Sequence, residues 1–244
     1  MSELRLENVS HSFGAVEVFR GLSLEIARGE FAAVVGPSGC GKTTLLGLCS
    51  GFLKPSSGRV ECAGRVRTVY QQDGLFPWLT VAQNIALGLR HVRDHAERDA
   101  RLAEMLALIR LEGFAAHYPH QLSGGMRQRV ELARALAGDT DILLLDEPFS
   151  SVDYLTRLRL RGELARMLAE LPRTVVLVTH DIEEAAQLAD RVVVLSERPA
   201  VINCQLRVTL PRPRELTHPE VVETVHRTLA ELGLEQEALM NAGR

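Results

Sequence analysis

The 244-residue sequence predicts an α/β domain built around a buried parallel sheet. Three features predict this class: short continuous apolar runs, helix-length stretches between them, and a glycine-rich loop that joins one run to a helix. The apolar runs are 31–35, 142–145, 174–179 and 191–195. Before the first run, residues 22–26 alternate between apolar and polar side chains, which is typical of a half-buried strand.

The composition is that of an ordinary globular protein, with 46% apolar residues, 24% charged residues and a formal net charge of −3. Such a charge creates no strong field toward nucleic acid, so we expect no nucleic-acid partner. The apolar runs are far shorter than the roughly 20 residues that span a bilayer, and residues 1–7 lack the apolar block of a signal peptide. Four cysteines show no metal-binding spacing. We therefore expect a soluble cytoplasmic protein.

Further segments surround this α/β pattern. Apolar residues at 102, 105, 106 and 109 share one helical face. This pattern predicts a mainly helical insertion over residues 80–120. Another amphipathic face at 221–232 follows the proline-rich residues 211–214, which we expect to form an extended linker. We predict a single domain over residues 1–244, with a helical subdomain at about 80–135 and a C-terminal extension at about 205–244.

Residues 36–43 read GPSGCGKT and fit the phosphate-loop pattern G-x-x-x-x-G-K-[ST]. Glycines allow backbone amide groups to turn inward, and the helix that follows adds the positive end of its dipole. Lys42 places an ammonium group on the β- and γ-phosphates of a nucleotide. Thr43 offers a hydroxyl to Mg²⁺, which needs few protein ligands. The loop therefore predicts a site for the phosphates of a nucleotide and for Mg²⁺.

Two acidic residues, Asp146 and Glu147, follow the run at 142–145. Because ligands of open α/β sheets bind beyond the carboxyl ends of strands, Asp146 is a candidate Mg²⁺ ligand, directly or through water. Glu147 is placed to polarise a water for attack on the γ-phosphate. A plain turn is the alternative for this Asp-Glu-Pro segment. His180 follows the run at 174–179, and it is either a donor to the γ-phosphate or an ordinary surface or core histidine.

Ser123, Gly124 and Gly125 precede a helical face at 126–136. Ser123 is predicted to cap this helix. A serine and two glycines at an open helix N-terminus also form a second anion site. One nucleotide cannot easily occupy two such sites on one subunit, so a second subunit could complete the first one's pocket.

Together these motifs resemble, in order and spacing, the nucleotide-binding subunits of ATP-binding cassette (ABC) transporters over residues 3–200. The resemblance implies a RecA-like P-loop NTPase core, an antiparallel β subdomain and a helical subdomain that carries the signature. It also implies a head-to-tail homodimer that hydrolyses two sandwiched ATP molecules. The matching segments are 36–43, Gln71, 122–128, 142–148, 150–153 and His180.

The resemblance also implies residue roles. Phe13 matches the aromatic residue that stacks on adenine, with a core position as the alternative. Gln71, with Gln72 as its neighbouring alternative, matches a glutamine that binds Mg²⁺ or water and senses the membrane subunit. Residues 123–125 would touch the γ-phosphate of the partner's ATP, and Asp153 would lie at the dimer interface. The expected catalytic residues are Glu147, His180 and Gln71; the metal ligands Thr43, Gln71 and Asp146; and the nucleotide-binding residues Phe13, Gly36, Pro37, Ser38, Gly39, Cys40, Gly41, Lys42, Thr43, Thr44, Ser123, Gly124, Gly125 and Asp153.

Residues 71–85 and 179–200 resemble importers of the nitrate, sulfonate and taurine group. The resemblance then implies an ATPase on the inner face of the cell membrane that drives uptake of a small solute. Its partners would be integral-membrane permease subunits and, indirectly, a solute-binding protein. Residues 75–90 would face the permease, and Trp78 lies there either exposed or packed in the core. The alternatives are a soluble ABC ATPase that acts outside transport and a kinase-like nucleotide-binding protein.

Overall fold

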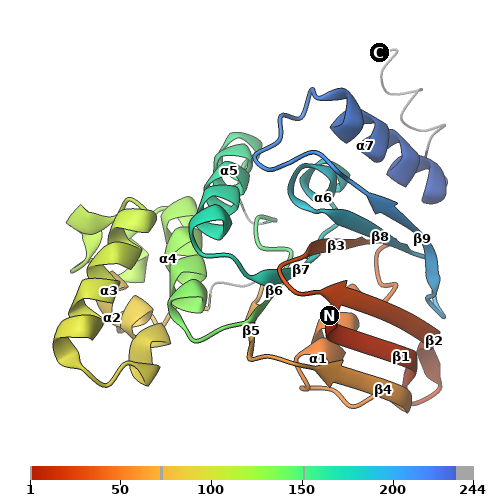
Figure 1. The fold of residues 1–244 in the computed structure, drawn as a ribbon, viewed down its shortest axis with the longest axis horizontal. Coiled ribbons are helices and arrows are strands. Elements are labelled where there is room, and N and C mark those ends of the chain that lie inside the picture. Colours follow the sequence, from red (N-terminus) through yellow and green to blue (C-terminus); the bar gives the residue numbers. More distant parts are fainter. Residues whose placement is uncertain (1, 72–73, 151, 235–244) are drawn as a thin grey trace. The chain divides into compact units, whose positions relative to one another are not determined.

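The computed structural model describes residues 2–71, 74–150 and 152–234, which belong to two compact units (Figure 1). Unit 1 combines the segment before residue 64 with the segment after residue 173. Unit 2 is the continuous segment 64–173. The N-terminal and C-terminal parts of the sequence therefore fold together, and unit 2 is an insertion between them.

An antiparallel sheet begins unit 1. Its central strand β1 (Ser2–Phe13) pairs with β2 (Val16–Ala27) on one side and with β4 (Ser57–Cys62) on the other. The alternating residues at 22–26 lie within β2, where Leu22, Leu24 and Ile26 are buried. The predicted strand is therefore confirmed, although β2 starts six residues earlier.

The second sheet of unit 1 contains the predicted parallel strands. β3 (Phe31–Val35) lies between β7 (Thr174–Val178) and β8 (Arg191–Leu195) and runs parallel to both. β9 (Ile202–Arg207) pairs antiparallel with β8. Every residue of β3 and β7 is buried, which explains why these strands are continuous apolar runs.

Three helices complete unit 1 (Figure 1). α1 (Lys42–Cys49) follows the phosphate loop, α6 (Ile182–Leu188) contacts β3 and β8, and α7 (Pro219–Glu231) contacts α6 and β9. The helix α7 contains most of the predicted amphipathic face of the C-terminal extension, with Val221 fully buried and Val222 exposed.

The predicted linker at 211–214 contains neither helix nor strand, but one of its residues belongs to the core. Arg214 is 5% exposed, and its guanidinium donates hydrogen bonds to the carbonyls of Leu210 (2.7 Å) and Ala189 (2.6 Å). It also forms an ion pair of 3.2 Å with Asp190. Because Ala189 and Asp190 directly follow α6, the buried cation binds a carbonyl near a helix C-terminus and holds the extension in place.

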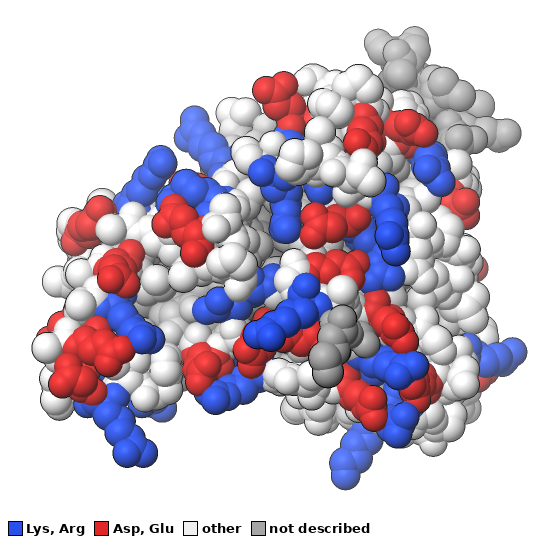
Figure 2. Space-filling model, viewed as in Figure 1, with Lys and Arg blue, Asp and Glu red and all other residues white. Residues whose placement is uncertain are grey.

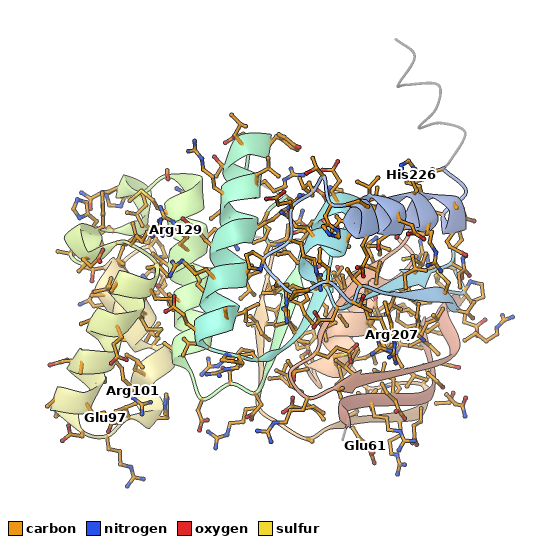
Figure 3. The ribbon with its side chains drawn as sticks, turned by 45° about the horizontal axis from the view of Figure 1, so that its top comes forward. Glu61, Glu97, Arg101, Arg129, Arg207 and His226 are labelled. Carbon is orange, nitrogen blue, oxygen red and sulfur yellow. The ribbon has the colours of Figure 1, made fainter. Side chains whose placement is uncertain are left out.

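The described residues of unit 2 form two parallel strands and four α-helices. β5 (Val66–Val69) pairs with β6 (Ile142–Asp146), whose residues are all buried. The first helices are α2 (Val81–Ala86), capped by a reciprocal pair of hydrogen bonds between Thr80 and Gln83, and α3 (His95–Leu108), capped by Asp94. On α3, Glu97 and Arg101 form an ion pair of 2.7 Å, as expected for residues four apart (Figure 3).

The later helices of unit 2 are α4 (Gly124–Ala137) and α5 (Tyr154–Glu170). Ser123 is the N-cap of α4, as predicted, because its hydroxyl accepts a hydrogen bond from the Met126 amide at 3.3 Å. Short 3₁₀ turns connect the helices at η1 (Gly88–His91), η2 (Glu112–Phe114) and η3 (Pro119–Gln121). Helices therefore dominate the stretch 80–120, as the sequence predicts.

Charged side chains of both signs are interspersed on the face shown in Figure 2. This mixture agrees with the small formal net charge of −3. Among the helices of the described residues, each is too short or too polar to cross a membrane.

The buried Arg214 predicts a measurable contribution to stability. We expect Arg214→Met to lower the free energy of unfolding by about 3 kcal/mol, because the substitution leaves buried carbonyls without donors. Arg227→Met, on the exposed side of α7, is the matched control and should change it by less than about 0.5 kcal/mol. Urea titrations followed by circular dichroism measure both values. Equal effects of the two substitutions would contradict a stabilising role of Arg214.

Candidate functional site

The phosphate loop lies between β3 and α1, and its glycines are required by close packing. Gly41 has a φ of +116°, and a methyl group added to it would lie 2.4 Å from Cγ1 of Val18 and 2.9 Å from Cζ of Phe19. A methyl group on Gly36 would lie 3.1 Å from the Leu195 carbonyl oxygen. A side chain at position 41 would therefore move the loop away from the strand that supports it, and Gly36 is tightly packed against β8.

Lys42 folds back over the loop. Its Nζ donates hydrogen bonds to the carbonyl oxygens of Gly36 (2.8 Å) and Pro37 (3.1 Å), and the side chain is 8% exposed. The ammonium group is therefore held at the phosphate loop and does not extend into solvent. Cys40, within the loop, is buried, and this burial raises the pKa of its thiol above the usual value.

The first turn of α1 has no side-chain cap. Gly41 occupies the N-cap position in a left-handed conformation, and no acidic residue lies in the first turn. The other α-helices of the described residues all have a side-chain cap. The positive end of α1 is thus available to an anion, and the Thr43 side chain is exposed there.

Phe13, at the end of β1, is 52% exposed. The core position considered for Phe13 is therefore wrong, and its ring is accessible to a ligand. The buried ring of His11 contacts it edge-to-face, with 4.7 Å between ring centroids. His11 is a supporting residue that the sequence analysis missed, although its i, i+2 spacing from Phe13 places both residues on one face of a strand.

His180 is exposed at the turn between β7 and α6. Hydrogen bonds fix this turn: the Asp181 amide donates to the Thr179 hydroxyl (2.9 Å), and Asp181 caps α6 by accepting from the Glu184 amide (2.9 Å). The core alternative for His180 is therefore wrong. Its imidazole lies at the carboxyl end of a parallel strand, where ligands of such sheets bind.

In unit 2, the two predicted carboxylates lie at the end of β6 and directly after it. Asp146 ends the strand and is only 7% exposed, whereas Glu147 is partly exposed. Glu147 has a φ of +46°, a left-handed conformation that is unfavourable for residues with a Cβ atom. The turn is held by Ser150, whose amide and hydroxyl donate to the Glu147 carbonyl (3.2 and 3.0 Å). Strained residues of this kind cluster at functional sites.

The predicted signature residues lie at the N-terminus of α4. Ser123 and Gly124 are exposed, and a methyl group on Gly125 would lie 3.0 Å from Cγ2 of Thr156. Gly125 is therefore required by the close approach of α4 to α5. The same Thr156 donates through its amide to Asp153 (3.0 Å), which caps α5. Hydrogen bonds from Thr156 lower the pKa of the Asp153 carboxyl below its usual value.

The predicted residues divide between the two units. Gln71 is exposed in a bend after β5, while its alternative Gln72, like Ser151 of the 150–153 segment, lies outside the described residues. Unit 1 brings together the phosphate loop with Lys42, Thr43 and Thr44. Unit 1 holds Phe13, residues 36–44 and His180; unit 2 holds Gln71, Ser123, Gly124, Gly125, Asp146, Glu147 and Asp153.

Comparisons with known proteins agree with this set of motifs. Residues 19–150, more than half of the chain, match the family described as ABC transporter. An aliphatic sulfonates import ATP-binding protein from Nocardia farcinica is 45% identical over 223 residues, which cover 91% of this chain and 89% of that protein. A nitrate import ATP-binding protein from Synechococcus elongatus is 45% identical over 225 residues, which cover 87% of this chain and 34% of that protein.

Comparison of the fold with solved structures gives the same family. The dimeric structure of MJ0796, described as a bacterial ABC transporter cassette, superposes on this chain with a TM-score of 0.73 at 32% sequence identity. The aligned region covers 85% of this chain and 100% of that chain. This likeness confirms the predicted α/β P-loop fold. The chain belongs to the ABC transporter family, as an ATP-hydrolysing, ATP-binding subunit of an importer.

Proposed function

We propose that this chain hydrolyses MgATP as one of two identical subunits of an importer for a small anion, such as nitrate or an aliphatic or aminated sulfonate like taurine. The similarity to import ATP-binding proteins for aliphatic sulfonates and for nitrate supports this class of solute. The single observation that carries the nucleotide site is the phosphate loop. There, a buried lysine ammonium and an uncapped helix N-terminus adjoin Gly41, where the packing leaves no room for a side chain.

The phosphate loop, Phe13 and His180 of unit 1 each have a role in binding ATP. Lys42 exchanges its two carbonyl partners for the β- and γ-phosphates, and the amides of residues 36–44 hold the phosphate chain. Phe13 stacks on adenine through its exposed face, while the edge contact with His11 fixes its ring. The His180 imidazole donates a hydrogen bond to the γ-phosphate.

The residues also fit Mg²⁺. Thr43 of unit 1 would supply a hydroxyl oxygen, and Asp146 and Gln71 of unit 2 would supply a carboxylate and an amide oxygen. Such hard oxygen donors are those that Mg²⁺ prefers. Asp146 is mostly buried at the end of a rigid strand, which suits a fixed ligand. When bound, the ion neutralises phosphate charge.

Glu147 orients and deprotonates the attacking water. Its backbone conformation is imposed by a turn whose next residues, Pro148 and Phe149, are buried. The fold therefore holds the carboxylate at a position that it would not adopt freely, which is the expected arrangement for a preorganised base.

A second copy of the chain completes each ATP site. The exposed Ser123 and Gly124 offer hydroxyl and amide donors to the partner's γ-phosphate. Beside the cap residue Asp153, two apolar side chains are strongly exposed: Tyr154 (55%) and Leu155 (65%). An exposed apolar pair next to a polar cap is well suited to a protein interface, and we place the dimer contact there.

The permease subunits dock on unit 2. A cavity of about 780 Å³ is lined partly by Arg67, Phe76 and Arg90. Phe76 is 41% exposed, and Trp78 beside it is 68% exposed, which excludes the core position for Trp78. Neither Arg67 nor Arg90 forms an ion pair within the described residues. An apolar permease helix with an acidic side chain matches this surface. The chain then lies on the inner face of the membrane, and a solute-binding protein delivers solute from the other side.

Glu147→Gln tests the proposed hydrolysis. We expect this variant to bind ATP with wild-type affinity, to hydrolyse it at least about 100-fold more slowly, and to accumulate as an ATP-bound dimer, because binding does not need the base. Phosphate release and size-exclusion chromatography measure these effects. Lys42→Ala is the control that should lose ATP binding. Normal turnover by Glu147→Gln would refute the role of Glu147.

The strained backbone at Glu147 gives a separate prediction. Both Glu147→Gly and Glu147→Ala remove the carboxylate and should abolish hydrolysis. Only glycine relieves the positive φ, so we expect the glycine variant to be more stable than the alanine variant by about 0.5–1 kcal/mol. Chemical unfolding of the two variants measures this difference. A glycine variant of equal or lower stability would show that the turn is not strained.

The docking surface is tested by Trp78→Ala. This variant should lower the amount of permease that co-purifies with the chain by at least about tenfold, because a large aromatic anchor is lost. Its ATP hydrolysis as a free subunit should not change. Phe114→Ala, which removes another partly exposed aromatic ring of unit 2, is the control. Full co-purification of permease with Trp78→Ala would place the docking surface elsewhere.

A further inference from the structure

The loop between β8 and β9 is fixed beside the phosphate loop in unit 1. The Ala200 amide donates a hydrogen bond of 2.7 Å to the Val18 carbonyl, and Val18 is the residue that packs against Gly41. Two further hydrogen bonds close the β8–β9 loop on itself, from the Ser196 amide to the Val201 carbonyl and from the Val201 amide to the Ser196 hydroxyl, each 3.0 Å. The tip of this loop therefore has a defined position.

Arg198 lies at this tip and reaches the phosphate loop. A methyl group built on Gly39 would lie 3.2 Å from Nη2 and 4.0 Å from Cζ of Arg198. Gly39 is itself exposed and has a φ of +76°. The charge of Arg198 also acts on the neighbouring Cys40: burial raises the pKa of that thiol, while Lys42 and Arg198 oppose the rise. The guanidinium thus adjoins the loop from outside the phosphate motif.

The hydrogen-bond donors of Arg198 are available. Within the part of the chain that the structure describes, Arg198 forms no hydrogen bond or ion pair, and its side chain is exposed. Two other arginines of unit 1 are engaged: Arg191 pairs with Glu30 at 2.6 Å and Arg214 with Asp190 at 3.2 Å. An unpaired guanidinium beside an anion-binding loop is available to a ligand, because its planar fork matches phosphate oxygens.

We propose that Arg198 is a second cation of the phosphate site and that its guanidinium binds the α- and β-phosphates of the nucleotide. This assignment rests on the nucleotide site of the proposed function. Backbone amides of such a loop hold the α- and β-phosphates, whereas the loop lysine serves the β- and γ-phosphates. Arg198 adjoins the backbone at Gly39 and therefore acts on the phosphates that ATP and ADP share.

The effect of Arg198 is expected to be moderate and dependent on salt. Its side chain is exposed, so water and ions screen its attraction for phosphate. We expect Arg198→Ala to raise the dissociation constants of ATP and ADP by the same factor, about fivefold at 0.15 M salt. The slope of log Kd against log salt should become smaller, because one cation fewer contacts the phosphates. Arg198→Lys should restore part of the affinity.

Arg207→Ala is the matched control. Arg207 is also exposed and unpaired within the described residues and lies in the same unit, on β9 (Figure 3). Arg198→Ala and Arg207→Ala lower the net charge of the chain by the same amount, so a difference between their dissociation constants reflects the position of the arginine. It should alter either dissociation constant by less than about 1.5-fold. Thermal unfolding of both variants without nucleotide checks that the fold is retained.

Calorimetric titration of wild type and variants with MgATP and with MgADP separates the possible outcomes. Equal dissociation constants for Arg198→Ala and Arg207→Ala would overturn the role of Arg198. A loss confined to ATP would also overturn it, because contact with the shared phosphates must weaken ADP as well. Failure of the wild-type chain to bind either nucleotide would instead refute the proposed function. Parallel weakening with rescue by lysine supports the assignment.

Discussion

Gly41 contacts Val18 and Phe19 so closely that no Cβ atom could be placed between them, and the phosphate loop depends on this contact. The same glycine stands at the N-cap of α1, so the helix has no capping side chain and its first amides stay available. Val18 also accepts the hydrogen bond that anchors the β8–β9 loop. Support of the loop and its capacity to bind anions therefore have a common origin in one tight packing contact.

Arginine carries nearly all the positive charge of this chain, and its functions divide according to burial. The guanidinium of Arg214 is enclosed and holds the C-terminal extension through carbonyl groups and a carboxylate. Arg198 and Arg90, which are exposed and have no partner among the described residues, lie instead at the phosphate loop and at the cavity of unit 2. A buried cation needs hydrogen-bond acceptors or a counter-charge within the protein. An exposed cation is solvated by water and remains available to a ligand or a partner.

Much of this arrangement could be predicted from sequence, because buried parallel strands and phosphate loops leave strong local signals. The strands β3, β7 and β8 coincide with continuous apolar runs. The strand β4 has no buried residue, so no hydrophobic pattern in the sequence predicts it. The burial of Arg214 depends on contacts with residues far along the sequence, such as Ala189. The positive φ of Glu147 occurs at a residue that is not glycine, so no glycine in the sequence marks it. Sequence motifs thus predict the candidate site residues, while the backbone strain and the packing around them are visible only in the structure.

The two lysines of the chain differ sharply in accessibility. Lys42 is enclosed by the carbonyl groups of its own loop, whereas Lys54 lies exposed on the surface after α1. Reagents that attack side-chain amines will therefore find essentially one reactive lysine on the folded protein. A fluorophore, a surface linker or a mass tag attached through this amine would sit at a known position and leave the phosphate loop unmodified.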